Sequence, residues 1–317
     1  MIAEPQARGV TGAGVLAGQG LTAEPAAPAS QARFPDGAHF RIEIPSCEGP
    51  EVLRAIVDEA TSRGVTVNRV SQGSGAMLHS EAELAELARI AADNGIEVSL
   101  FVGPREEWDI GRAAAAADGG VFAGRLRGTR QLRYAIEDIL RATEQGIRGF
   151  LIADIGLLQL VSEMQQSGQL PASIVWKVSA VMAPSNPLAF RVLERLGAST
   201  VNVPSDLTVS QIGEMRAVST LPIDLYVETP DAMGGVVRGH EAADLIEVAA
   251  PMYLKFGLRN SRMLYPSGLH LTPDAIAIAR EKVRRAQIAM EWIARSELKL
   301  TQSSPGAPGL GIPEPAR

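Results

Sequence analysis

Residues 174–206, IVWKVSAVMAPSNPLAFRVLERLGASTVNVPSD, decide the fold of this 317-residue chain. The segment opens with Ile174–Ala180, an apolar run that carries a single lysine and is typical of a buried strand. A loop follows, and Asn186 then marks the start of a helix that ends at Gly197. The β-branched run 200–203 comes next. A strand, a helix and a second strand in this spacing predict two parallel strands joined by a right-handed crossover.

The same alternation recurs on both sides of this segment. Strands are expected at 40–45, 65–70, 97–102, 149–153, 174–180, 200–203, 223–228 and 252–257, and each is followed by a predicted helix. Eight such pairs over about 260 residues predict a (β/α)8 TIM-type barrel in a single domain. An open doubly wound sheet is the alternative, but PSCEGP follows the first strand where that fold needs a glycine-rich dinucleotide fingerprint. We expect 103–128 to form a loop over the barrel mouth, although 120–126 could form a ninth strand.

Both ends of the chain are expected to lie outside the barrel domain, which we place at residues 38–300. Residues 1–37 and 301–317 are rich in small residues and proline, a composition that provides little to bury and predicts disordered tails. The first tail lacks the basic and apolar regions of a secretory signal. No run reaches the roughly 20 apolar residues that span a bilayer, so we expect no membrane partner.

Charge and cysteine content exclude several functions. A net charge of −6 argues against nucleic-acid binding, which needs a dense basic face. The only cysteine, Cys47, excludes an intramolecular disulfide and any iron–sulfur or all-cysteine metal site within one chain. The cytoplasm is the simplest location. A divalent metal cofactor and an oligomeric state are left open.

Polar residues near the carboxyl ends of the strands are the candidate site, because barrel enzymes place their active sites there. The catalytic candidates are Glu228, Lys177 and Lys255, and the candidates for substrate binding are Asn202, Arg69, Arg259, Glu43 and Asp154. A lysine inside an apolar strand is costly unless it is paired or faces a polar cavity. We expect Lys177, Asn202, Glu228 and Lys255 to converge on one cavity, with Glu228 as general base or metal ligand.

Simpler structural roles compete with these assignments. The two lysines could form plain ion pairs with Glu228, Asp154 or Glu43 inside the barrel. Asp154 stands just before a predicted helix and could simply cap it.

Three segments resemble the core of the peptidase U32 family, the collagenase-like proteins. They are RIEIPSCEGPEVLRAIVDEA at 41–60, LERLGASTVNVPSDLTVSQI at 193–212 and DLYVE at 224–228, and the resemblance spans roughly residues 40–257. It implies a barrel, together with either peptidase activity or hydroxylation of RNA or quinone precursors. Hydroxylating members hold an iron–sulfur cluster on four cysteines. This chain lacks those cysteines and reads VETPD at 227–231 where such members have Val-His-Gly, so we expect neither the cluster nor the hydroxylase role.

Three readings of function follow. The first is a U32-like enzyme that acts on a small or peptide-like anionic substrate, with hydrolysis implied by the resemblance alone. The second is a lyase or isomerase in which a desolvated lysine forms a Schiff base or removes a proton next to a carbonyl. The third is a barrel that has lost catalysis and acts as a scaffold.

Overall fold

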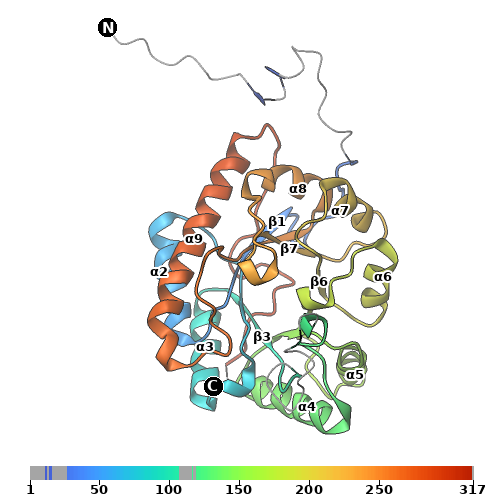
Figure 1. The fold of residues 1–317 in the computed structure, drawn as a ribbon, viewed down its shortest axis with the longest axis vertical. Coiled ribbons are helices and arrows are strands. Elements are labelled where there is room, and N and C mark those ends of the chain that lie inside the picture. The colour runs from blue at the N-terminus through green and yellow to red at the C-terminus, as the bar shows by residue number, and fades with distance from the viewer. Residues whose placement is uncertain (1–10, 13, 16–26, 107–115, 117–118, 316–317) are drawn as a thin grey trace.

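The computed structural model describes residues 11–12, 14–15, 27–106, 116 and 119–315. Eight parallel strands form a closed barrel in chain order, which confirms the predicted fold (Figure 1). The strands are β1 Phe40–Pro45, β2 Arg69–Gln72, β3 Glu97–Phe101, β4 Gly149–Ile152, β5 Val175–Val178, β6 Thr200–Asn202, β7 Ile223–Glu228 and β8 Met252–Phe256.

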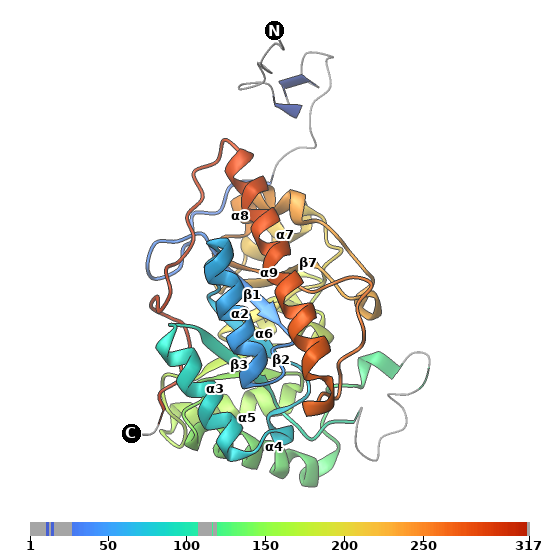
Figure 2. The ribbon, with the colours of Figure 1, turned by 90° about the vertical axis from the view of Figure 1, so that its left-hand side faces the viewer.

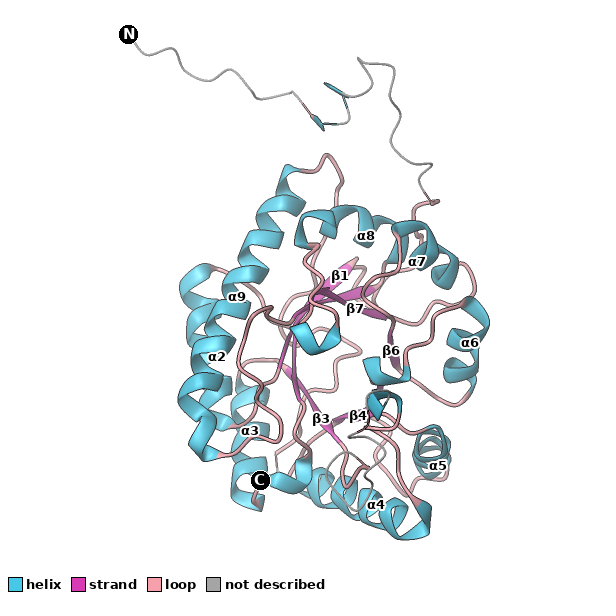
Figure 3. Ribbon diagram, in the orientation of Figure 1, coloured by secondary structure: helices cyan, strands magenta, loops and turns pink. Residues whose placement is uncertain are grey.

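Helices follow the strands and surround them as an outer layer (Figure 3). They are α2 Pro50–Arg63, α3 Glu81–Asp93, α4 Gly128–Glu144, α5 Ile155–Gln166, α6 Pro187–Arg195, α7 Val209–Arg216, α8 Ala242–Ala249 and α9 Thr272–Arg295. Local sequence sets their ends. Ser80 and Glu83 form a capping box at the start of α3, Asn186 caps α6, and Gly64 ends α2 in the left-handed conformation with φ 65°. No helix among the described residues is long and apolar enough to cross a membrane.

The hydrophobic core lies between the strands and the helices. Side chains alternate along each strand, so Met252, Leu254 and Phe256 of β8 join the apolar layer beneath the helices. Tyr253 and Lys255, between them, belong to the barrel interior. The same alternation in the other strands fills the interior with polar and charged residues, which is unusual for a barrel of this kind.

The prediction of a disordered C-terminal tail is wrong for residues 301–315. We call this segment the C-terminal strap. Ser303 and Ala307 are buried, and the backbone of the strap bonds to β1 and to the turns before β3 and β4. Figure 2 shows the chain after α9 running back along the body to the C-terminal end. Glycine and proline leave few side chains to pack, but the exposed backbone groups at the strand starts bind the strap instead.

The N-terminal tail is also partly ordered. Phe34 packs edge-on against Tyr253, with ring centroids 5.4 Å apart, and the Ser30 amide donates to Glu247 O at 2.7 Å. Most of the expected tail, 1–10, 13 and 16–26, lies outside the described residues.

The long excursion between β3 and α4 contains no strand in its described part. The 3-10 turn Gly119–Val121 and an irregular segment lead directly into α4, so the alternative of a ninth strand at 120–126 is excluded. The expected loop over the mouth falls partly on 107–115 and 117–118, outside the described residues.

Candidate active site

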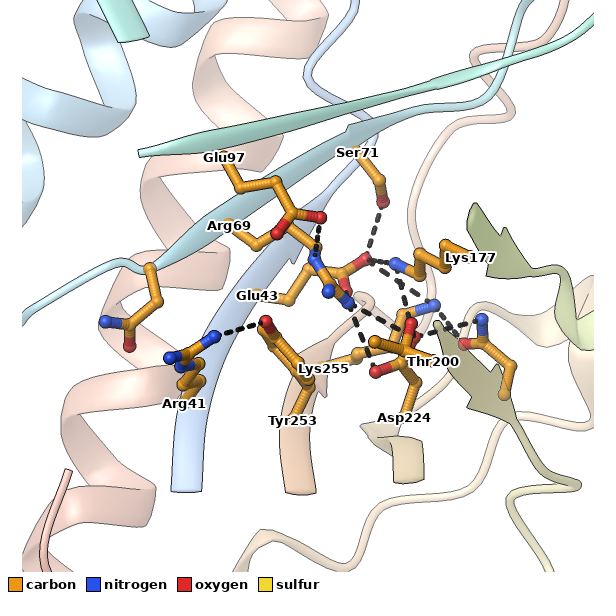
Figure 4. A network of polar contacts seen from close by, with 12 residues as sticks. Arg41, Glu43, Arg69, Ser71, Glu97, Lys177, Thr200, Asp224, Tyr253 and Lys255 are labelled. Carbon is orange, nitrogen blue, oxygen red and sulfur yellow. Dashed lines mark hydrogen bonds and ion pairs between the residues drawn. The ribbon is translucent and has the colours of Figure 1, made fainter. Parts of the chain in front are cut away.

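A fully buried network of charges fills the barrel interior, and Glu43 lies at its centre (Figure 4). Glu43 on β1 lies directly opposite Arg69 on β2 and Lys255 on β8. Its Oε2 is 3.3 Å from Arg69 Nη1, and its Oε1 is 3.6 Å from Lys255 Nζ. Lys177 Nζ of β5 and Ser71 Oγ both donate to the same Oε1, the hydroxyl at 2.7 Å. One carboxylate therefore holds three cations together.

Arg69 connects Glu43 to two further carboxylates. Its Nε is 2.6 Å from Glu97 Oε1, and its Nη1 is 3.2 Å from Asp224 Oδ1. The guanidinium lies 3.5 Å from the ring centroid of Tyr253, an arrangement that favours a desolvated cation. None of the Arg69, Glu43, Glu97 and Asp224 side chains is exposed. Buried arginine pairs of this kind persist only with several good partners.

The two lysines approach each other across the interior. Lys255 Nζ donates to Asn202 Oδ1, and the Asn202 amide donates to Val178 O. The ring of Tyr226 lies 4.0 Å from Lys255 Nζ. Tyr226 pairs in register with Lys255 and is half-buried, so its ring covers one side of the amine. Both ends of the Asn202 amide therefore have buried polar partners.

Burial and the neighbouring charges act in opposite directions on Glu43. Burial would raise its pKa, but Lys177, Lys255 and Arg69 together hold the pKa of this carboxyl well below its usual range. Burial lowers the pKa of Lys177 to about 7, with Glu43 opposing the shift and Lys255 adding to it. Of the groups around Glu43, Lys177 can therefore lose its proton near neutral pH.

Lysine is rare in this chain and is concentrated at buried positions. Lys177, Lys255, Lys282 and Lys299 are the only lysines among 30 basic residues, and the first three are at most 3% exposed. Lys282 of α9 donates to Pro45 O at 2.8 Å, and burial lowers its pKa to about 8. Arginine carries the positive charge almost everywhere else, including Arg41 and Arg69 of the barrel interior, so the amines of Lys177 and Lys255 depart from the usual choice of guanidinium in this chain.

Glu228 does not join the lysines, and its predicted place in the cavity is wrong. A bulge in β7 changes the register, so that Tyr226 pairs with Lys255 whereas Glu228 pairs with the outward-facing Phe256. The Glu228 carboxylate instead accepts the Arg259 amide at 3.1 Å and lies 3.7 Å from Arg285 Nε of α9. It lines a surface cavity of about 480 Å³ next to α9.

Two other predicted site residues also lie outside the network. Asp154 caps α5 by accepting the Leu157 amide at 3.0 Å, and its second oxygen accepts the Leu126 amide at 3.2 Å. Arg259 pairs at 3.2 Å with Asp231, and both side chains are more than half exposed. Asp154 therefore has the simpler role considered for it, that of a helix cap. Glu43, Arg69, Lys177, Asn202 and Lys255, in contrast, all belong to one network.

The sequence analysis missed two carboxylates of the network, Glu97 and Asp224. Only strand exits were considered, whereas Glu97 is the first residue of β3 and lies opposite Arg69. Arg69 itself begins β2, because that strand starts four residues later than predicted. Asp224 could have been found from its alternation with Tyr226, because residues two positions apart in a strand lie on the same face.

The mouth above the network is tied together by residues from three strand exits. Ser46 follows β1 with φ 64°, and its hydroxyl lies 2.5 Å from the Tyr265 hydroxyl. The Tyr265 ring packs so closely on Gly73 that a Cβ there would lie 2.4 Å from two ring carbons. Glu48 accepts the Gly73 amide at 2.8 Å. A non-glycine residue with positive φ at this position is a strain that often accompanies function.

Metal and cluster chemistry find no matching residues here. Within the described ranges, no three His, Cys, Asp or Glu residues are grouped to hold a metal ion. Cys47 is buried, and one cysteine cannot supply the four ligands of the iron–sulfur cluster that the resemblance implies for some relatives.

Comparison with known proteins finds a family match over part of the chain. The profile described as Peptidase family U32 matches residues 121–229, about a third of the chain. No curated protein matches. Among solved structures, the chain is similar to the U32 peptidase Mk0906, with 15% sequence identity over 71% of this chain and 78% of that one, and a TM-score of 0.41.

A second similar structure belongs to a protein assigned as a fructose-1,6-biphosphate aldolase from Coccidioides immitis. The identity is 9%, the coverage is 81% of this chain and 93% of that one, and the TM-score is 0.50. At such low identity the likeness supports the barrel fold and says nothing about the reaction.

Proposed function

We propose that this chain, whose residues 121–229 match the profile of peptidase family U32, is a barrel enzyme of that family whose chemistry depends on the buried amine of Lys177. Its substrate is a small anionic molecule with a carbonyl group, and the reaction is a lysine-dependent lyase or isomerase step. Hydrolysis, the reaction that the resemblance implies, loses its expected base because Glu228 faces α9.

The observation that carries the proposal is the position of Lys177. Its side chain is completely buried, contacts Glu43 and lies near a second lysine. An amine that is desolvated beside another cation is a better nucleophile and base at neutral pH, because a larger fraction of it is unprotonated. Arginine would satisfy Glu43 equally well as a charge but stays protonated at any physiological pH. Keeping lysine here in an arginine-rich chain supports a role that needs the neutral amine.

The neighbouring residues have complementary roles in this proposal. Lys255 and Arg69 supply positive charge that favours an anionic substrate. The neutral Lys177 amine attacks the substrate carbonyl carbon, the carbonyl oxygen leaves as water with the two amine protons, and an imine remains that takes up a proton from water. Alternatively the amine removes a proton next to the carbonyl. The partly exposed Tyr226, whose ring lies 4.0 Å from Lys255 Nζ, would contact a substrate bound at the lysines.

Reductive trapping tests the proposal directly. The protein is incubated with a panel of 2-oxo acids and sugar phosphates in the presence of borohydride, which reduces an imine to a stable secondary amine. Peptide mapping then locates the added mass. We expect modification at Lys177 with at least one member of the panel, and loss of that modification in Lys177→Met.

Two controls make the result decisive. Lys255→Met keeps Lys177 and tests whether the second lysine only assists. The exposed Lys299 reports non-specific reaction, because it is reachable by any carbonyl. Modification confined to Lys299, or equal modification in Lys177→Met and in the wild type, would show that Lys177 is only a structural cation and would favour the scaffold reading.

A further inference from the structure

The C-terminal strap closes the end of the barrel opposite the mouth. Its backbone bonds to three strand starts, through Ser303 to Phe40 O at 3.1 Å, Gly306 to Gly95 O at 2.8 Å, and Glu314 to Gly146 O at 2.8 Å. Glu314 also pairs with Arg148 at 3.0 Å. A segment whose composition predicts disorder is therefore held along its whole described length.

The strap supplies most of the hydrogen-bond partners of Arg41, the interior cation nearest to the end where the strands begin. Arg41 Nε donates to Ser303 Oγ at 2.9 Å and Nη2 donates to Pro308 O at 2.6 Å. Its Nη1 donates to the Tyr253 hydroxyl at 3.0 Å, and Tyr253 in turn lies under Arg69. Arg41 is 1% exposed, so without the strap its charge would face water.

A second connection runs from the strap to the lysine through ion pairs. The Gly311 amide donates to Glu97 Oε2 at 3.0 Å, while Glu97 Oε1 holds Arg69. Arg69 pairs with Glu43, and Glu43 holds Lys177. Each member of this series is completely buried. The backbone of the strap is thus the end of a continuous chain of polar contacts that begins at the amine.

We propose that the C-terminal strap is a positioning element of the active site. It fixes the Arg69–Glu97 pair and keeps water out of the barrel floor, by which we mean the end of the interior where the strands begin. This inference rests on the proposed function for its catalytic meaning, but the coupling itself can be measured without a substrate. Displacing the strap hydrates the floor, and Lys177 then holds its proton more tightly.

The direction of that effect follows from the groups that face Lys177. These are Glu43 of β1, Arg69 of β2, Asp224 of β7 and Lys255 of β8. Burial is the largest cause of the lowered pKa of Lys177, and Lys255 and Arg69 add to it. Water at that end of the barrel weakens the burial effect, which is the largest cause, and screens the carboxylates and the cations alike. The net lowering therefore shrinks, and the pKa of Lys177 rises when the strap is displaced.

Close backbone packing offers a way to displace the strap with one methyl group. A Cβ on Gly95 would lie 2.5 Å from the Gly306 nitrogen, and a Cβ on Gly311 would lie 2.6 Å from Arg148 O. Gly64 provides a matched control for Gly95. Both are left-handed, with φ 65° and 63°, and both follow a helix, but a Cβ on Gly64 would have nothing within 4 Å. Gly64→Ala and Gly95→Ala therefore share the backbone strain and differ in the clash with the strap.

The experiment compares the titration of Lys177 in Gly95→Ala, Gly311→Ala, Gly64→Ala and the wild type. With 13C-labelled lysine the full chain gives signals from only four residues, and Lys177→Met assigns the relevant one. Limited proteolysis of 301–315 reports release of the strap. We expect release in Gly95→Ala and Gly311→Ala, with the Lys177 pKa raised by about one unit, a tenfold lower ratio of neutral to charged amine. Gly64→Ala should titrate like the wild type.

Several results would overturn the proposal. Release of the strap with an unchanged Lys177 titration would make the strap a structural plug only. An equal shift in Gly64→Ala would attribute the effect to general loosening. A strap that stays bound in both clash variants would show that the packing is not tight enough to control the interior. Failure of borohydride trapping, by contrast, would refute the proposed function and leave this coupling intact.

Discussion

Replacing Glu43 by glutamine tests whether one carboxylate holds the barrel interior together. Gln keeps the size of the side chain and the Ser71 contact but removes the charge that Lys177, Lys255 and Arg69 share. At an effective dielectric of about 20, two unit charges at the 3.6 Å Lys255 distance attract by about 4–5 kcal/mol. Removing one partner of a buried pair typically costs about 3–5 kcal/mol. We expect Glu43→Gln to lower the free energy of unfolding by a similar amount.

Urea unfolding followed by circular dichroism measures this loss, and two variants calibrate it. Glu314→Gln removes an exposed carboxylate from its pair with Arg148, and such surface pairs contribute less than about 1 kcal/mol. Lys177→Met in the Glu43→Gln background removes an amine that has lost its hydrogen-bonded carboxylate and keeps only Asp224 at 3.9 Å, so it should restore part of the loss. The double variant would then be more stable than Glu43→Gln alone.

The difference in stability between the wild type and Glu43→Gln should depend on pH in a definite direction. The folded-state pKa of Glu43 lies below the ordinary value of 4.5, so its ionisation stabilises the folded chain fully above about pH 4.5. The difference between the wild type and Glu43→Gln should narrow as pH falls below that value. A loss under about 1 kcal/mol at pH 7, or a difference that does not narrow in acid, would refute the central role of this carboxylate.

Three further predictions concern residues in and around the network. Lys177 has a pKa of about 7 in the folded chain and 10.5 when exposed. Between these pH values the unfolded chain binds more protons, so this lysine makes the free energy of unfolding rise with pH. Lys177→Met should flatten that rise in urea unfolding experiments from about pH 7 to 10. Glu228→Gln should leave borohydride trapping at Lys177 unchanged, because the bulge in β7 turns Glu228 toward Arg285; a loss of trapping would restore its predicted catalytic role. Asp154→Ala should lower stability by about 1 kcal/mol through loss of the α5 cap, with trapping again unaffected; reduced trapping at wild-type stability would contradict the capping assignment.

The barrel could be predicted from the sequence because each strand–helix pair is encoded locally. Apolar runs, capping residues and terminal glycines lie within a few positions of one another, and eight repeats leave little choice of topology. The inward-facing lysines could be predicted for a related reason. Lys177 and Lys255 stand in strands that otherwise read as buried, and burial of an amine requires a polar partner.

The errors arose where long-range contacts override local pattern. Glu228 shares the alternation of Tyr226 in the sequence, but a bulge between them breaks it, and no residue type marks that bulge. The C-terminal strap has the composition of a disordered segment. It is ordered because its backbone meets the barrel floor, at glycines such as Gly95 and Gly311 where a side chain would not fit. Such complementarity exists only after the barrel has formed.

The order of charges around the barrel also carries information about strand alignment. Lys255, Glu43, Arg69 and Glu97 lie opposite one another on four adjacent strands and alternate in sign. The smallest slide that keeps the same faces inward is two residues. Sliding β1 that way past β2 would place Glu43 opposite Ser71 and would bring Arg41 opposite Arg69, two like charges with no water between them. The charged residues inside the barrel therefore favour one strand register over the registers shifted by two residues. The apolar residues between the strands and the helices stabilise the barrel, and the interior ion pairs select its register.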